Sequence, residues 1–252
     1  MNQKTANKIL LETEQGYDDI SQKFSQTRKH FWRELESIKD FCVENDKVLD
    51  FGCGNGRLLD LLAEKKINYW GVDVSEKLVE IAKDRHQKDN VVFGKINPSQ
   101  TSLAFEAGFF NTIYSIAVFH HFPSEKYRQE VASELFEKTK SGGRVVITVW
   151  YLWQKKYFKN ILQNWKTKFF ETFICMSSFR SAGSRHDSGA KNLDWNDCMI
   201  SFTDNEGRKF QRFHHAFTKR ELKKLFKNAG FEIEKCEIVE GRNIMLVGKK
   251  KE

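Results

Sequence analysis

Residues 47–59 read Lys47-Val-Leu-Asp50-Phe-Gly52-Cys-Gly54-Asn-Gly56-Arg57-Leu-Leu. A short apolar run ends in an acid, three alternating glycines follow, and a leucine-rich helical pattern then begins. This order predicts a strand, a tight turn and a helix. The glycines remove every Cβ where a ligand would press against the backbone. The stretch therefore predicts an α/β fold with a ligand site at its first strand-to-helix turn.

The strand-then-acid pattern is repeated in residues 69–73, Tyr-Trp-Gly-Val-Asp. Asp73 follows Gly56 by 17 residues, as expected for a carboxylate that holds the ribose of a nucleoside. A dinucleotide site would need its third glycine at position 57, where Arg57 stands. Asp50 would also repel a pyrophosphate, whereas it suits a ligand with an ammonium or sulfonium cation. A dinucleotide site and a glycine-rich turn without a ligand remain the alternatives.

These residues resemble the first motif of the class I S-adenosylmethionine-dependent methyltransferases. In that family the first acid and the glycine loop hold the methionine end of the cofactor, and the second acid holds the ribose hydroxyls. The resemblance implies S-adenosylmethionine as the cofactor. It also implies an α/β, Rossmann-like sheet of seven strands with helices on both faces.

The rest of the chain alternates strands and helices, which favours a mostly parallel sheet in a single domain, 1–252. Within it we expect a helical lid (1–45), a cofactor-binding core (46–150), a basic aromatic cap (151–216) and a C-terminal helix and strand pair (217–252). The expected helices cover 4–14, 21–41, 56–65, 76–87, 124–138, 154–179 and 219–228. The expected strands cover 47–51, 68–72, 90–93, 112–118, 144–150, 231–239 and 243–247. Ser75 is an expected N-cap, and 181–192 an expected mobile loop.

Length and composition are those of a soluble globular protein, with 252 residues, 40% hydrophobic and 30% charged. No apolar run approaches the roughly 20 residues that span a bilayer, and the first residues lack the apolar region of a secretory signal. The five cysteines are scattered without a CxxC pair, which indicates reduced thiols rather than disulfides or a zinc site. We therefore expect a cytoplasmic protein that uses neither membrane nor metal.

Basic charge is concentrated in one segment. The net charge is +8, and residues 151–220 hold thirteen Lys and Arg against six Asp and Glu. Aromatic side chains are interleaved with them: Trp153, Tyr157, Phe158, Trp165, Phe169, Phe170, Phe173 and Phe179. Phosphate attraction combined with base stacking is what a nucleic-acid surface requires. The alternative is a lysine-faced amphipathic helix that packs its aromatic residues inward.

Two histidines follow the fourth expected strand, in Tyr114-Ser-Ile-Ala-Val-Phe-His120-His121-Phe-Pro123. The small residues before them would leave room for a cofactor at the level of the glycine loop. Adjacent residues of an extended segment point to opposite sides, so we expect only one histidine, His120, in the cavity wall. A metal would need further ligands at suitable spacing, which the sequence does not offer.

Three segments narrow the resemblance to the tRNA wobble-uridine carboxymethyl methyltransferases, which esterify a 5-carboxymethyl group on the first anticodon base. They are an opening helix with Tyr17, Ile20, Phe24, Ser25, Thr27, Arg28 and Trp32; residues 115–122 with Gly142-Gly143-Arg144 and Val149-Trp150; and Gln211-Arg212-Phe-His214-His215-Ala-Phe217 before Glu221-Leu222. The chain departs from the family's pattern at Lys95 and Asn111, where acids are usual. Asn97 is then the candidate for the adenine contact.

The resemblance implies tRNA, through its anticodon stem-loop, as the substrate and a small activating protein subunit as a partner. The candidate cofactor ligands are Tyr17, Asp50, Gly52, Cys53, Gly54, Asn55, Gly56, Asp73, Val74, Asn97, Ser115, Ile116 and Ala117. The candidate substrate ligands are Arg28, Trp150, Arg212, His214, His215 and Phe217. The candidate catalytic residues are Arg28, His120, Arg212 and His215.

A carboxymethyl carboxylate has a pKa of about 4 and is already ionised at pH 7, so its methylation needs no general base. We expect catalysis by orientation and by exclusion of water. An arginine would hold the carboxylate or a flanking phosphate, because a guanidinium binds such groups bidentately. Two other hypotheses compete: a small-molecule methyltransferase, and a methyltransferase-like scaffold that binds RNA or a partner without turnover.

Overall fold

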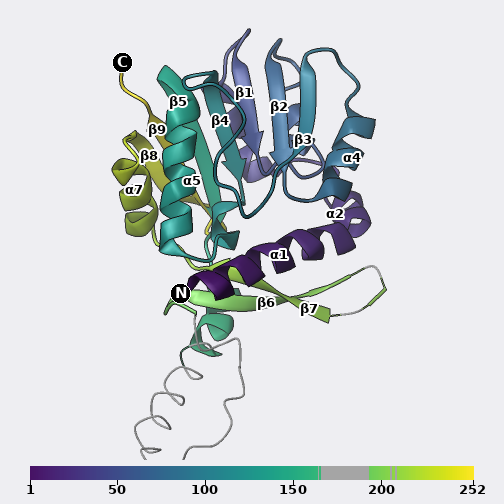
Figure 1. The fold of residues 1–252 in the computed structure, drawn as a ribbon, viewed down its shortest axis with the longest axis vertical. Helices are drawn as coiled ribbons and strands as arrows, with labels where there is room; N and C mark the ends of the chain where they lie inside the picture. Colours follow the sequence, from purple (N-terminus) through teal and green to yellow (C-terminus); the bar gives the residue numbers. More distant parts are fainter. Residues whose placement is uncertain (164, 166–192, 205, 208) are drawn as a thin grey trace, which may run out of the picture.

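The computed structural model describes residues 1–163, 165, 193–204, 206–207 and 209–252. One sheet of seven strands lies at its centre (Figure 1). Its strand order is β3 (Val91–Lys95), β2 (Asn68–Asp73), β1 (Lys47–Phe51), β4 (Phe110–Ile116), β5 (Thr139–Trp150), β9 (Asn243–Lys249) and β8 (Glu232–Val239). Strands β1 to β5 run parallel, and β9 lies antiparallel to both β5 and β8. The predicted α/β fold with a seven-stranded sheet is confirmed.

Helices connect the strands and precede the sheet. They are α1 (Gln3–Asp19), α2 (Ser21–Thr27), η1 (Arg33–Phe41), α3 (Arg57–Leu61), α4 (Glu76–Arg85), η2 (Phe119–His121), α5 (Glu125–Lys138) and α7 (Lys219–Asn228). Helix α7 has the predicted bounds, and its start is fixed by the capping box that Thr218 and Glu221 form at its first turn. Ser75 caps α4 as predicted, its side chain accepting a hydrogen bond from Leu78 N.

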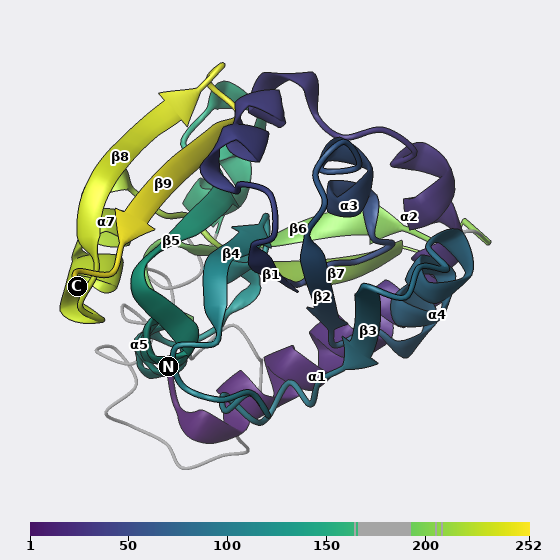
Figure 2. The same cartoon turned by 90° about the horizontal axis from the view of Figure 1, so that it is seen from above.

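The two faces of the sheet bury different sets of side chains. In β1, Leu49 packs in a cluster with residues of α5 and α7, whereas its neighbour Val48 packs with residues of η1, α3 and α4. The alternation follows from the two-residue period of a strand. Helices therefore cover both faces, as predicted, and Figure 2 shows the strands between them.

The helix predicted at 21–41 is broken in two. Helix α2 ends at Thr27, and a 3-10 helix, η1, begins at Arg33. At the break the Thr27 hydroxyl donates a hydrogen bond back to Lys23 O at 2.7 Å, which competes with continuation of the helix. Arg28 then leaves the helical conformation, and its guanidinium lies 4.4 Å from the centre of the Phe24 ring.

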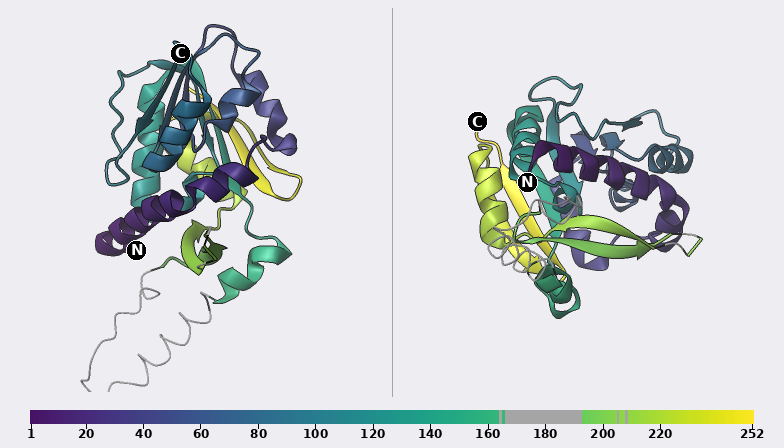
Figure 3. Two further views of the ribbon diagram at one scale, coloured as in Figure 1. Left: turned by 90° about the vertical axis from the view of Figure 1, so that its right-hand side faces the viewer. Right: turned by 60° about the horizontal axis from the view of Figure 1, so that its bottom comes forward.

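A two-stranded sheet, β6 (Asp197–Thr203) and β7 (Lys209–His215), was not predicted. It lies below α1, which runs between it and the seven-stranded sheet (Figures 1 and 3). Ile9 of α1 packs on Phe213 of β7. Of the helix predicted at 154–179, residues 155–163 are helical, while 166–179 and the loop predicted at 181–192 lie outside the described residues. None of the described helices has the length and apolar character needed to cross a membrane.

Candidate functional site

A pocket opens at the ends of β1 and β4, the neighbouring strands at which the strand order reverses. Open α/β sheets bind their ligands at this switch point. The walls come from the loops that follow β1 to β4, from α1 and α2, and from single residues of β5 and β7. They surround about 1170 Å³, part of it open to solvent.

The glycine loop forms the floor of the pocket. Gly52 has a φ of 84°, and a Cβ there would lie 2.2 Å from Cγ2 of Val118. The N–H groups of Gly52 and Cys53 both donate to the carbonyl oxygen of Val72, at 2.8 and 3.0 Å. Four predicted cofactor ligands of this loop line the pocket: Gly52, Cys53, Gly54 and Asn55. Gly56 lies outside the wall, because it faces His86 at the start of α3.

Asp73 lines the pocket and also holds the glycine loop. Its Oδ2 accepts a hydrogen bond from Gly54 N at 2.8 Å, and its Oδ1 accepts one from Ser75 N at 2.9 Å. Burial raises the pKa of Asp73, and the backbone hydrogen bonds from Ser75 and Gly54 oppose that shift. Each carboxylate oxygen keeps a second lone pair for a ligand hydroxyl. The place of Asp73 therefore suits the predicted ribose contact.

Asp50 lies behind the loop and is absent from the pocket wall. Its Oδ2 accepts a hydrogen bond from the Tyr69 hydroxyl at 2.5 Å. Burial raises the pKa of Asp50 to about 7, against the opposing effect of the hydrogen bond from Tyr69. Direct contact with a ligand was expected of Asp50; in this structure its charge reaches a ligand through the loop, by Coulombic attraction.

Two arginines stand on the side of the pocket near α2. Arg28, a predicted substrate ligand, lines the wall beside Phe24. Arg57 was not predicted; its guanidinium lies 3.6 Å from the centre of the Trp32 ring, and burial lowers the pKa of Arg57 to about 10. Its position directly after Gly56, the last glycine of the loop, is the sequence feature that could have indicated a place in the site.

Arg212 brings an uncompensated positive charge to the pocket wall from β7. It is 3% exposed and lies against the Phe202 ring, 3.2 Å from its centre. Its Nε and Nη1 groups have no hydrogen-bond partner, and no acid of the described ranges forms an ion pair with it. Burial lowers the pKa of Arg212. A buried cation with unpaired donors is costly unless an anion arrives to bind it.

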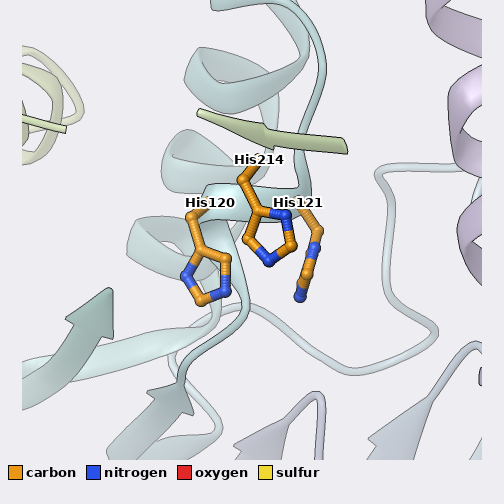
Figure 4. Close-up of side chains that lie close together, drawn as sticks. All are labelled: His120, His121 and His214. Carbon is orange, nitrogen blue, oxygen red and sulfur yellow. The ribbon is translucent and has the colours of Figure 1, made fainter. Parts of the chain in front are cut away.

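Three buried histidines meet beside Arg212 (Figure 4). His120 and His121 both line the pocket, which corrects the expectation that only one of them would. The expectation assumed an extended segment, whereas residues 119–121 form a 3-10 turn. His214 stacks on His120, with ring centres 5.2 Å apart, and lies outside the wall. His121 Nε2 shares a hydrogen bond with the hydroxyl of Tyr17 at 2.8 Å. Tyr17 lies in α1 and is a predicted cofactor ligand.

The histidine cluster is the one group in the described part of the chain with the spacing of metal ligands, since three of its nitrogens lie within 4.8 Å of one another. Burial, followed by the charge of Arg212, lowers the pKa of His121 to about 3. Burial is also the largest cause that lowers the pKa of His120 and of His214. The imidazoles are thus neutral, but a dication beside Arg212 would be repelled, and no carboxylate joins the cluster. An anionic ligand fits the same space better.

His215 has a different place from the predicted one. It faces away from the pocket, where its Nδ1 lies 2.7 Å from Asp197 Oδ1 and its Nε2 lies 2.6 Å from Glu221 Oε1. These contacts tie β6 and β7 to the first turn of α7. Burial alone would lower the pKa of His215, yet the hydrogen bonds to Asp197 and Glu221 outweigh it and raise the pKa. The predicted contact of His215 with substrate is therefore replaced by a structural role.

The sequence profile of a family described as a methyltransferase domain matches residues 22–235. The chain belongs to this methyltransferase family. A tRNA (carboxymethyluridine(34)-5-O)-methyltransferase alkbh8 from Xenopus tropicalis is 35% identical over 144 residues, 57% of this chain and 22% of the relative. A tRNA (carboxymethyluridine(34)-5-O)-methyltransferase from Schizosaccharomyces pombe is 26% identical over 219 residues, 87% of this chain and 88% of the relative. The chain thus spans about a fifth of the first relative and most of the second.

Solved structures share the fold of this chain. A SAM-dependent methyltransferase from Methanosarcina mazei has a TM-score of 0.65 at 21% identity, over 88% of this chain and 99% of that one. A chain from the complex between the Haloferax volcanii Trm112 methyltransferase activator and a putative methyltransferase has a TM-score of 0.61 at 14% identity, over 95% and 97%. At these identities the likeness establishes the Rossmann-like methyltransferase fold.

Some of the remaining predicted site residues line the pocket and others do not. Val74, Ile116, Ala117 and Trp150 line the pocket. Ser115 and Phe217 are buried outside the pocket. Asn97 is exposed, and its Oδ1 accepts a hydrogen bond from Ser99 N in a local turn. Ile96, Pro98 and Gln100 stand in the wall where Asn97 was expected.

The aromatic residues of segment 151–216 that the structure describes pack mainly against one another. Trp150, Trp153, Tyr157, Trp165 and Phe202 surround a buried cluster with Ile161 and Ile200. Phe158 is 38% exposed. Inward packing, the alternative to base stacking, thus accounts for most of them, while Phe169, Phe170, Phe173 and Phe179 lie outside the described residues.

Replacing His215 with glutamine is expected to lower the free energy of unfolding by about 2 kcal/mol, because buried Asp197 and partly exposed Glu221 lose a cationic partner. A raised pKa in the folded state stabilises the fold fully below the unfolded pKa of about 6.5, and this stabilisation is lost as the pH rises through the folded pKa. Denaturant unfolding should therefore show the largest gap between wild type and His215→Gln near pH 6, narrowing toward pH 9. A gap independent of pH would contradict a charged His215.

Proposed function

We propose that the chain transfers a methyl group from S-adenosylmethionine to the carboxylate of a 5-carboxymethyluridine at the wobble position of tRNA. The observation that carries this proposal is Arg212, a buried cation with unpaired donors, in the same pocket as the glycine loop and Asp73. A cofactor cradle and an anion site thus face one space. That combination suits an acceptor that carries a carboxylate.

The residues around the glycine loop fit S-adenosylmethionine. The cofactor supplies a methyl group on a positively charged sulfur. Gly52 and Gly54 provide bare backbone for it, Asp73 provides lone pairs for the ribose hydroxyls, and buried Asp50 provides negative charge behind the loop. A pyrophosphate would be repelled by Asp73 in the wall and by Asp50 behind the loop, which disfavours a dinucleotide.

Arg212 would orient the acceptor by binding its carboxylate, with Arg28 as a second cation in the pocket wall. The neutral imidazoles of His120 and His121 bound the same space without competing for the anion, and the Trp150 ring, on which His120 stacks, lines the pocket beside them. The carboxylate is ionised at pH 7, so no residue has to remove a proton. Catalysis then depends on positioning and on the exclusion of water.

Two relatives support the choice of acceptor, since the Xenopus tropicalis and Schizosaccharomyces pombe proteins are named for methylation of carboxymethyluridine. Cytoplasmic action, on tRNA, accords with the free thiols of Cys42, Cys53, Cys198 and Cys236. A small activating subunit is also part of the proposal, because a structure of the same fold was solved with the Trm112 activator. A small-molecule acceptor is the second candidate.

The proposal is tested by incubating the chain, alone and with a Trm112-type activator, with labelled S-adenosylmethionine and tRNA that carries 5-carboxymethyluridine. Nucleoside analysis should find label in the wobble-uridine methyl ester. Label found only in small metabolites would overturn the tRNA acceptor. Cofactor binding without transfer to any fraction would favour a non-catalytic scaffold.

Cofactor affinity is expected to fall as the pH drops below 7, because Asp50 is then protonated and its attraction for the cationic cofactor is lost. The dissociation constant for S-adenosylmethionine should rise by up to about tenfold per pH unit between pH 7 and 5.5. Asp50→Asn should bind more weakly at pH 8 and vary less with pH. Calorimetric titrations that give parallel pH profiles for the two proteins would contradict this role.

A further inference from the structure

The exposed face of α7 carries positive charge that nothing in the described structure neutralises. It consists of Lys219, Arg220, Lys223, Lys224 and Lys227, here called the basic strip. The opposite face of the helix is apolar and buried, through Leu222, Leu225 and Phe226. The single acid of the helix, Glu221, is turned toward His215. The strip therefore presents cations alone to solvent.

Helices that only need a solvated surface pair their charges, and this chain does so elsewhere. Lys8 pairs with Glu12 in α1, and Lys126 pairs with Glu130 in α5, both four residues apart. In α7 the corresponding positions repeat positive charge: 219 with 223, 220 with 224, and 223 with 227. Like charges at this spacing destabilise a helix. The basic strip thus opposes the stability of its own element.

Neighbouring acids do not relieve this repulsion. Strand β8 packs beside α7 and carries three glutamates, each paired with a residue outside the strip. The pairs are Glu232 with Lys251, Glu234 with Arg144, and Glu237 with Lys235. No ion pair joins a residue of the basic strip to an acid within the described ranges. An external polyanion is what would neutralise it.

We infer that the basic strip binds the phosphate backbone of the tRNA substrate outside the pocket, an inference that rests on the proposed function. The strip spans nine residues of helix, about 12 Å from the first to the last, which lets it face several phosphates. It begins four residues after His215 and is joined to β7 by the contact of His215 with Glu221. Strand β7 carries Arg212 into the pocket, so one continuous segment links the acceptor site to the strip. Figure 1 shows α7 beside α5, above the two-stranded sheet of β6 and β7.

The test measures binding of an unmodified tRNA transcript by fluorescence anisotropy across a range of KCl concentrations. The variant is Lys223→Gln, Lys224→Gln and Lys227→Gln combined, and the control is Lys77→Gln, Lys83→Gln and Lys88→Gln, three exposed lysines in and after α4. Both sets lower the net charge by three. The α7 set should weaken binding roughly tenfold near 0.1 M salt and reduce the slope of log affinity against log salt by about 2 to 3. The variant with Lys223→Arg, Lys224→Arg and Lys227→Arg keeps the charge, so it should show the affinity and the salt slope of the wild type.

Equal salt slopes for wild type and the α7 set would overturn the inference, as would an equal loss in the control set. A strip that serves an acidic protein instead would leave the tRNA slope unchanged, which is the same negative result. Binding needs no turnover, so the two proposals fail separately. If the α7 set reduces the salt slope but the wild-type chain methylates no tRNA, the inference that the basic strip binds tRNA holds and the proposed function fails.

Discussion

Arg212→Met is expected to lower kcat/KM for methylation of carboxymethyluridine tRNA by roughly 10²-fold, about 3 kcal/mol, while the variant still folds and binds S-adenosylmethionine. Arg212 has unpaired Nε and Nη1 donors in the pocket and no acid partner in the described structure. Methyl transfer neutralises the acceptor carboxylate, so the attraction of Arg212 is strongest before the reaction. The loss should therefore appear more in KM than in kcat.

The same variant should unfold at an equal or higher denaturant concentration than wild type. A buried guanidinium without a counterion is costly, and methionine packs against Phe202 and Tyr17 without that cost. Arg144→Met is the matched control, because Arg144 is paired with Glu234 on the surface and should affect neither kinetic constant. Methylation by Arg212→Met at the wild-type rate would remove Arg212 from the acceptor site. Loss of cofactor affinity would move it to the cofactor side.

The elements that were predicted well are those encoded by neighbouring residues. The alternating glycines require a backbone without Cβ atoms, and the structure shows why at Gly52, where Val118 occupies the space. The start of α7 follows from Thr218 and Glu221, three residues apart, which form a capping box at its first turn. Patterns of this kind need no knowledge of what lies across the fold.

The features that were missed depend on contacts between distant parts of the chain. Strands β6 and β7 stabilise each other and pack on α1, a partner about 190 residues away that no local pattern discloses. His215 has the residue type of a site ligand, yet Asp197 and Glu221 make it a structural cation. Asp50 was placed correctly at the end of β1, but the hydroxyl of Tyr69 from the next strand holds it out of the pocket. Residue type and spacing thus located the site, and tertiary partners divided the roles within it.

Asp73→Asn is expected to raise the dissociation constant for S-adenosylmethionine by at least about 10²-fold, because hydrogen bonds to a charged acceptor contribute about 1.5–3 kcal/mol each. Asparagine keeps one oxygen for Gly54 N or Ser75 N, so the glycine loop retains part of its support. The melting temperature without cofactor should change far less than the affinity. Asp84→Asn, on the exposed side of α4, is the matched control and should bind normally. Calorimetry measures all three proteins.

A cofactor analogue without ribose hydroxyls separates the two contributions of Asp73. If Asp73 binds the ribose, 2′,3′-dideoxy-S-adenosylhomocysteine should bind wild type much more weakly than S-adenosylhomocysteine does, while Asp73→Asn should bind the two alike. The double-mutant cycle then gives the coupling between carboxylate and hydroxyls directly. If Asp73 acts only by holding the Gly54 and Ser75 amides, the analogue should lose the same affinity with both proteins. The second pattern would remove the ribose contact and leave Asp73 as the support of the loop.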